Sequence, residues 1–113
     1  MSRAGGRFPL LLAVALAFPA PALRAADAAR GHQVFEKWCT PCHGPGPAHP
    51  GTTALAALYH GTKPAALEER TDLTPAIVRQ YVRHGVTVMP FFRKTEISDA
   101  ELDALGAYLS RQK

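Results

Sequence analysis

Two cysteines and a histidine lie within five consecutive residues, and their types and spacing suit one covalent chemistry. The segment reads Cys39-Thr40-Pro41-Cys42-His43. Two thiols three residues apart can each add to one vinyl group of the same haem, and the adjacent histidine then lies beneath the iron. We therefore predict that Cys39 and Cys42 attach one haem c covalently and that His43 is an axial ligand of its iron.

A pair of cysteines at this spacing, taken alone, would also fit a redox disulfide or half of a zinc site. The redox interpretation further requires a strand before the motif and a sheet around it, and the sequence predicts neither. The chain has no other cysteines, so a structural disulfide elsewhere is not available. A small core of this kind benefits from a covalent staple, and the haem is the expected one.

The second iron ligand is predicted to be Met89. Met1 belongs to a segment that we expect to be removed, which leaves Met89, directly before Pro90, as the one methionine of the mature chain. A thioether is soft and neutral, so it favours ferrous iron and raises the haem potential. The alternatives are a buried methionine with no metal role or a histidine ligand from among His32, His49, His60 and His84.

Residues 1–26 are typical of a secretory signal peptide. Arg3 and Arg7 precede an apolar run, Leu10 to Phe18, and small residues follow it. The run is too short to cross a bilayer, which needs about 20 apolar residues; an uncleaved anchor is the alternative. Cleavage is expected after Ala22, Ala25 or Ala26. We therefore expect residues 27–113 to form one periplasmic domain with no membrane span.

Removal of this segment changes the charge of the chain. Arg3, Arg7 and Arg24 leave with it, so 10 of the 13 basic residues remain against 9 acidic ones, a net charge of +1. The basic balance thus belongs to the signal, and a nucleic-acid partner is not indicated.

The remaining sequence predicts helices and no strand. Two helices have clear ends: one begins at Pro75 after the N-cap Thr74 and stops at Gly85, and the last begins with the capping box Ser98 to Glu101. Other helical segments are expected at residues 28–38 (with Asp27 as N-cap), 53–59 and 64–70. In the helix after Thr74, the buried stripe is predicted to be Ile77, Val78, Tyr81 and Val82, with Arg79 and Arg83 outward. Residues 44–51 are a loop rich in proline and glycine, and the carbonyl of Pro45 or Pro47 is expected to accept a hydrogen bond from His43.

With these features the chain resembles the class I monohaem cytochrome c family over residues 27–113. The resemblance rests on Gly31 and Phe35, the Cys39 to His43 motif, Met89-Pro90, and the segment from Leu105 to Leu109. It implies an all-α, small class I cytochrome c-like fold of three to five helices wrapped around one covalently bound haem. It also implies that Gly31 on the first helix packs against Tyr108 on the last.

A narrower likeness is to the cytochrome subunits of flavocytochrome alkylphenol hydroxylases of the 4-cresol and eugenol type. It rests on Arg79 to Gly85, on Met89 to Phe92 and on Glu96 to Leu102. The likeness implies a non-catalytic electron carrier that accepts single electrons from a flavoprotein oxidising para-alkylphenols and passes them to another cytochrome or a copper protein. Phe91 or Phe92 is then expected near an exposed haem edge with Arg93 and Lys94 around it, and Arg70 and Tyr59 are candidates to bind haem propionates.

Two other functions fit the same residues. The chain could be a free soluble shuttle between respiratory complexes and a terminal oxidase. It could also be a ligand-binding or catalytic haem protein, if one axial position of the iron were open.

Overall fold

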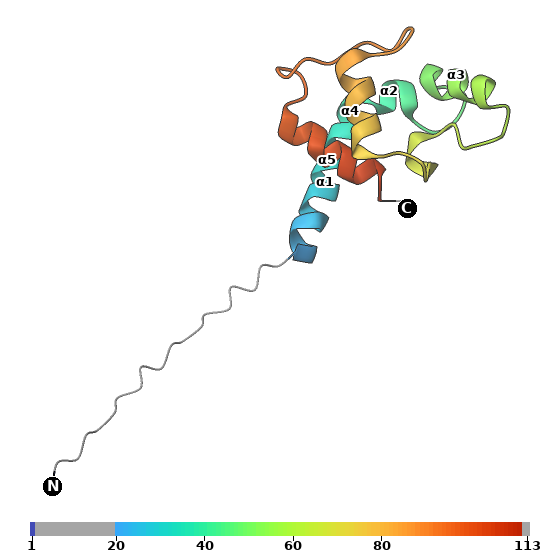
Figure 1. Cartoon of the computed structure of the whole chain (residues 1–113). Coiled ribbons are helices and arrows are strands. Elements are labelled where there is room, and N and C mark those ends of the chain that lie inside the picture. The colour runs from blue at the N-terminus through green and yellow to red at the C-terminus, as the bar shows by residue number, and fades with distance from the viewer. Residues whose placement is uncertain (2–19, 112–113) are drawn as a thin grey trace.

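The computed structural model describes Met1 and residues 20–111, so the apolar run predicted for the signal peptide lies outside the described residues (Figure 1). In the described part, all regular elements are helical apart from an isolated bridge between Val86 and Met89. The elements are α1 (Ala20–Trp38), α2 (Thr40–His43), α3 (Pro50–Tyr59), the 3-10 turn η1 (Leu67–Glu69), α4 (Pro75–His84) and α5 (Asp99–Leu109). The predicted all-α class is confirmed. Among these helices, none combines the length and apolar character needed to cross a membrane.

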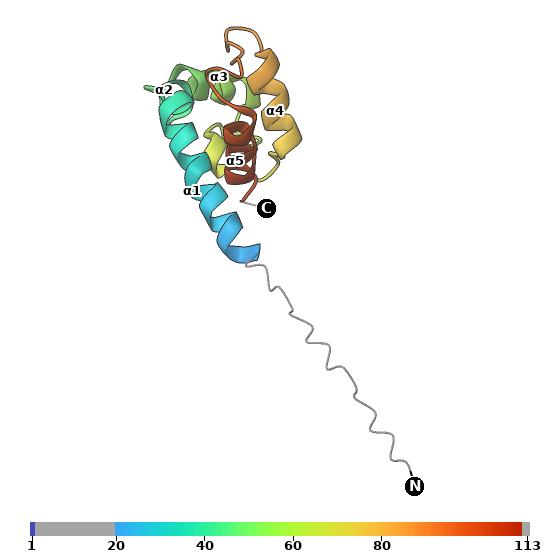
Figure 2. The ribbon, with the colours of Figure 1, turned by 90° about the vertical axis from the view of Figure 1, so that its left-hand side faces the viewer.

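The core lies where α5 packs against both α1 and α4. Figure 2 shows α5 between these two helices, with α2 and α3 grouped beyond the end of α1. Four side chains in this core are almost completely buried, and each contributes about 1.5–3 kcal/mol through burial. They are Phe35, Ile97, Leu102 and Leu105.

The ends of α4 and α5 follow from local sequence. The Thr74 side chain accepts a hydrogen bond from the Ile77 amide at 3.1 Å, and Pro75 occupies the first turn, where its missing N–H costs nothing. Ser98 and Glu101 form the reciprocal capping box at the start of α5. Both predicted starts are therefore confirmed, and the capping box fixes where the long α4–α5 loop ends.

Three predicted boundaries are wrong. The helix expected at residues 53–59 begins at Pro50, so residues 50–51 of the expected loop 44–51 are helical. Asp27 is not an N-cap, because α1 already begins at Ala20 and passes through residues 20–26. This stretch is rich in alanine, which has the highest helix propensity. The predicted helix at residues 64–70 is reduced to η1, and Ala66 and Arg70 on either side of it are extended.

The buried stripe predicted for α4 is only half right. Val78 and Val82 are buried, but Ile77 is 38% exposed and Tyr81 47% exposed. Arg83 was expected to point outward, yet its side chain is only 14% exposed, because it bonds to groups on the α4–α5 loop and on α5. Arg79 is 44% exposed, as expected for an outward side chain.

Candidate haem site

The motif residues lie on a single helical turn at the end of α1. The Cys39 amide bonds to the Phe35 carbonyl at 2.8 Å, which continues the chain out of α1, and Cys39 then begins α2 as its N-cap. The amides of Cys42 and His43 both bond to the Cys39 carbonyl, at 3.1 and 2.7 Å. Residues three and four apart lie on the same face of a helix. The structure therefore brings Cys39, Cys42 and His43 together on one side of this turn.

The two thiols have different surroundings. Cys39 is half-buried and Cys42 is exposed, and both are free. Burial, and secondarily the neighbouring Cys42, raises the pKa of the Cys39 thiol to about 12. Redox-active and metal-binding cysteines need the opposite, a lowered pKa that maintains the thiolate. The environment of Cys39 thus argues against a redox pair and is compatible with permanent covalent attachment.

The His43 ring is held with one nitrogen inward. Its Nδ1 is buried and has no hydrogen-bond partner, and burial lowers the pKa of the ring below its ordinary 6.5. The neutral imidazole that results is the form that binds metal ions. The start of α3 packs closely here, since a Cβ on Gly51 would lie 2.9 Å from Cε1 of His43. With Nδ1 turned inward, Nε2 is the nitrogen left to bind iron.

The predicted hydrogen bond from His43 to a proline carbonyl is not formed. The Pro45 carbonyl accepts from Nδ1 of His49 at 2.9 Å, and the Pro47 carbonyl accepts from Oγ1 of Thr53 at 3.1 Å. Both carbonyls predicted as partners are therefore used to shape the loop itself. The prediction named His43 as the donor to these carbonyls, but the donors are His49 and Thr53.

Met89 lies on the loop between α4 and α5, in a tight turn that starts at Val86. The Val86 amide bonds to the Met89 carbonyl at 3.1 Å, and the Met89 amide bonds back to Val86 at 2.9 Å. Gly85 makes the turn possible: its φ of +66° favours glycine, and a Cβ there would lie 2.5 Å from the Met89 carbonyl oxygen. The Met89 side chain is half-buried. The two hydrogen bonds therefore fix the shape of the turn that carries Met89.

A contact between two aromatic rings links the motif to the Met89 loop. Trp38 directly precedes Cys39, Phe92 follows Met89 by three residues, and their rings meet edge-to-face with centroids 5.8 Å apart. The sequence alone does not pair Trp38 with Phe92, because residues 54 positions apart share no local pattern. The pair keeps the two halves of the predicted site beside each other.

The histidines that were alternatives to Met89 have other surroundings. His84 is exposed, and its Nδ1 donates to the Gln80 carbonyl of its own helix at 2.9 Å. His32 is exposed and stacks on Tyr108 with ring centroids 5.2 Å apart, and His60 is exposed at the C-cap of α3. His49 bonds to Pro45 as described above. Met89 therefore stays the prediction for the second ligand.

The residues present fit a haem. One neutral imidazole and one neutral thioether are a donor set suited to haem iron. The protein also leaves the large apolar side chains of Ile77 and Tyr81 uncovered on α4, which fits a large apolar group beside them. Cys39 and Cys42 would hold the group covalently, and His43 and Met89 would bind its iron.

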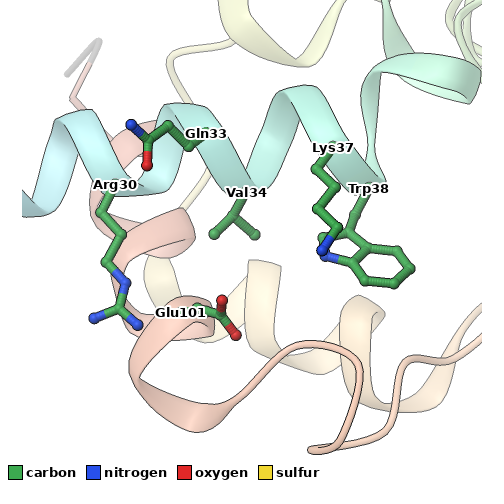
Figure 3. A pocket seen from close by; sticks show the side chains of 6 residues that line it. All are labelled: Arg30, Gln33, Val34, Lys37, Trp38 and Glu101. Carbon is green, nitrogen blue, oxygen red and sulfur yellow. The ribbon is translucent and has the colours of Figure 1, made fainter.

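A shallow groove of about 200 Å³ lies elsewhere, between α1 and the first turn of α5. Figure 3 shows its side chains, which come from these two helices: Arg30, Gln33, Val34, Lys37, Trp38 and Glu101. Its carboxylate, Glu101, is already used by the helix cap, where it accepts from the amide and the hydroxyl of Ser98 at 2.8 Å each. These bonds lower the pKa of Glu101 below 4.5. The groove thus presents no free carboxylate, and its other charged side chains are the cations Arg30 and Lys37.

Comparisons with known proteins identify the family of the chain. The sequence profile of the family "Cytochrome C oxidase, cbb3-type, subunit III" matches residues 26–109. Cytochrome c6 of Picosynechococcus sp. (strain ATCC 27264 / PCC 7002 / PR-6) is 36% identical over 103 residues, which are 90% of this chain and 86% of that protein. No solved structure matches the chain. The chain therefore belongs to the cbb3-type subunit III family of class I monohaem cytochromes c, and it is a c-type electron carrier.

Proposed function

We propose that this chain is the electron-accepting cytochrome subunit of a periplasmic flavoprotein that oxidises para-alkylphenols. It would carry single electrons on one haem c that is attached through Cys39 and Cys42, with His43 and Met89 as iron ligands. The haem supplies the one-electron redox couple. The chain would supply two neutral ligands, one from α2 and one from the α4–α5 loop, and an iron with both ligands in place would have no open position for substrate.

The observation that carries the proposal is the turn from Cys39 to His43. It combines a half-buried thiol, a second thiol on the same face, and a neutral imidazole with one nitrogen turned inward. With both thiols bonded to a haem and the imidazole bound to its iron, this turn would keep no free nucleophile or base for substrate chemistry. This turn instead offers attachment and ligation, which are the requirements of an electron carrier.

An exposed apolar surface beside Met89 supports a lasting partner. Val88 is 94% exposed, Phe91 60% and Val86 46%, and all three lie within three residues of Met89. Arg93 and Lys94 border them, with side chains 71% and 73% exposed. An apolar surface with a charged rim is typical of a protein interface. A flavoprotein subunit docked there would shorten the electron path to the haem.

A second candidate is a free shuttle that delivers electrons to a terminal oxidase. It is favoured by the family match and by the likeness to cytochrome c6. A shuttle meets its partners briefly, so it would be isolated alone and would keep its apolar surface in contact with water.

Purification from the native source at low salt separates the two candidates. The subunit proposal predicts that a flavoprotein elutes together with this chain and reduces its haem when a 4-alkylphenol is added. Elution as a monomer, with no flavoprotein and no phenol-dependent reduction, would support the shuttle.

The docking surface can be tested in the same complex. Phe91→Ser should weaken binding of the flavoprotein at least ten-fold, which is about 1.4 kcal/mol. Leu58→Ser is the matched control, since Leu58 is 68% exposed on α3. Equal affinities of the two variants would place the interface elsewhere.

Covalent attachment is tested separately, because haem c must stay with the denatured chain in acidified organic solvent.

A further inference from the structure

We infer that Arg83 is a positioning residue for the Met89 ligand. It positions Met89 by closing the Met89 loop, defined here as residues 84–91. This inference rests on the proposed function, in which Met89 binds the iron. The Arg83 guanidinium joins the Phe92 carbonyl, just after the loop, to the carboxylate of Asp99 on α5.

The backbone of Phe92 is held at both of its polar groups by two consecutive residues of α4. Its amide donates to the Val82 carbonyl at 2.7 Å. Its carbonyl accepts from Nη1 of Arg83 at 3.0 Å. The chain that leaves α4 is therefore brought back to the last turn of α4. The Met89 loop is a closed loop whose two ends are fixed to each other.

Arg83 is also anchored to α5. Its Nη2 donates to Oδ1 of Asp99 at 2.9 Å, and its side chain is only 14% exposed, whereas that of Asp99 is 48% exposed. A guanidinium can hold a carbonyl and a carboxylate at the same time because its donors are arranged in a rigid fork. One largely buried side chain thus connects α4, the loop end and α5, and partial burial strengthens its bonds relative to exposed ones.

The turn that carries Met89 is bonded within itself. We therefore expect it to move as a unit when the ends of the Met89 loop move. Among residues 20–111, the bonds that hold the turn from Val86 to Met89 are its two backbone hydrogen bonds, and Val88 at its tip is almost fully exposed. Surface turns with few packed neighbours open at low free-energy cost. We conclude that the closure at Arg83 and Phe92 controls how often Met89 leaves the iron.

Arg79 provides a matched control one turn earlier on the same helix. It pairs with the same Asp99 at 3.7 Å and also with Asp103, and its side chain is 44% exposed. Arg79 carries the same charge as Arg83 and lies on the same helix, but among residues 20–111 it makes no bond to the loop. Replacing Arg79 removes an ion pair between α4 and α5 without touching the loop end.

The test measures competition between Met89 and added imidazole in the ferric, haem-loaded protein. Arg83→Ala should bind imidazole at least ten-fold more tightly than the unsubstituted chain, while Arg79→Ala should change the affinity less than two-fold. The loss of the ferric methionine–iron charge-transfer band reports displacement of Met89. Amide exchange at Phe92 gives a second measurement and should be faster in Arg83→Ala only.

The outcomes separate this inference from the proposed ligation. Equal imidazole affinities for Arg83→Ala and Arg79→Ala, or an unchanged affinity in Arg83→Ala, would overturn the role of Arg83. Absence of the charge-transfer band from the unsubstituted protein would instead overturn Met89 as a ligand. Should Arg83→Ala fail to mature, Arg83→Lys replaces it, since an ammonium lacks the fork that reaches both acceptors. An intermediate imidazole affinity would support the role, and an unchanged affinity would overturn it.

Discussion

Gly31 of α1 lies directly against the backbone carbonyl of Ala104 in α5. A Cβ on residue 31 would lie 2.1 Å from that oxygen and 2.6 Å from the Cβ of Tyr108. The first and last helices therefore cross with their backbones almost in contact. This crossing buries Phe35, which in turn precedes the turn carrying Cys39 and His43. The pairing of Gly31 with Tyr108 that the family resemblance implied is confirmed.

Gly31→Ala should destabilise the haem-loaded protein by about 3 kcal/mol, because the added methyl group meets backbone and the helices must separate. Unfolding in guanidinium chloride, followed by far-UV circular dichroism, measures the change. Gly106→Ala is the control, because Gly106 lies inside helix α5 as Gly31 lies inside helix α1. There the nearest atom to an added Cβ is Cα of Pro75 at 3.0 Å. Its cost should be smaller by at least about 1 kcal/mol, and equal costs would contradict the importance of the crossing.

The features that depend on residues close together in the sequence were predicted correctly. The cap at Thr74 and the capping box at Ser98 involve residues no more than three positions apart, so their side-chain pattern is visible in the sequence. The spacing of Cys39, Cys42 and His43 is likewise local. The structure places these three on one helical turn, as the spacing requires.

Features that depend on distant residues were predicted poorly. Periodicity could not show which apolar side chains of α4 the protein itself covers, so Ile77 and Tyr81 were wrongly placed in the core. Arg83 has an ordinary helix position in the sequence, and only the fold shows that Phe92 and Asp99 come within its reach. The contact between Trp38 and Phe92 could not be predicted for the same reason.

Stability at alkaline pH should depend on Tyr108. Its hydroxyl donates to Glu68, and burial, followed by the bond to Glu68, raises the pKa of Tyr108 to about 12 from an ordinary 10. A raised pKa of this kind contributes stability fully below pH 10, and the contribution is lost as pH rises through about 12. The free energy of unfolding should therefore fall between pH 10 and 12, and it should fall less in Tyr108→Phe. Tyr81→Phe, at an exposed tyrosine, is the control, and a fall equal to that of the unsubstituted protein in Tyr108→Phe would refute the assignment.

Stability in acid should depend on Asp72. The Arg70 guanidinium donates two hydrogen bonds of 2.7 Å to it, and these bonds hold the pKa of the carboxyl below its ordinary 3.8. A lowered pKa contributes stability above the ordinary value, and this is lost as pH falls through the folded-state pKa. Urea unfolding should therefore show Asp72→Asn to be less stable at pH 7, with the difference shrinking below pH 4. Glu69→Gln provides the comparison at an exposed carboxylate, and a difference independent of pH would contradict the prediction.

The bonds of Arg70 also bear on the predicted propionate site. Arg70 donates to the Tyr59 hydroxyl at 2.7 Å as well as to Asp72, so the two residues predicted to bind propionates are joined to each other. The Arg70 side chain is largely buried, and Asp72 already neutralises much of its charge. This cluster fixes the segment after η1 against α3. Its role toward propionates stays a prediction.

Met89→Ala tests the second iron ligand and decides between an electron carrier and an open-site haem protein. With Met89 as ligand, the substitution should abolish the ferric methionine–iron charge-transfer band and lower the reduction potential, because a soft neutral ligand that favours ferrous iron is lost. The ferrous variant should bind one carbon monoxide rapidly, whereas the unsubstituted protein should bind it slowly or not at all. His84→Ala is the control, since the His84 ring is exposed and bonded to its own helix. His84→Ala should keep the band. Persistence of the band in Met89→Ala, or rapid carbon monoxide binding before any substitution, would exclude Met89 as the permanent ligand. An iron that binds carbon monoxide rapidly before any substitution would have one axial position free to bind a small molecule, which is the requirement for a ligand-binding or catalytic haem protein.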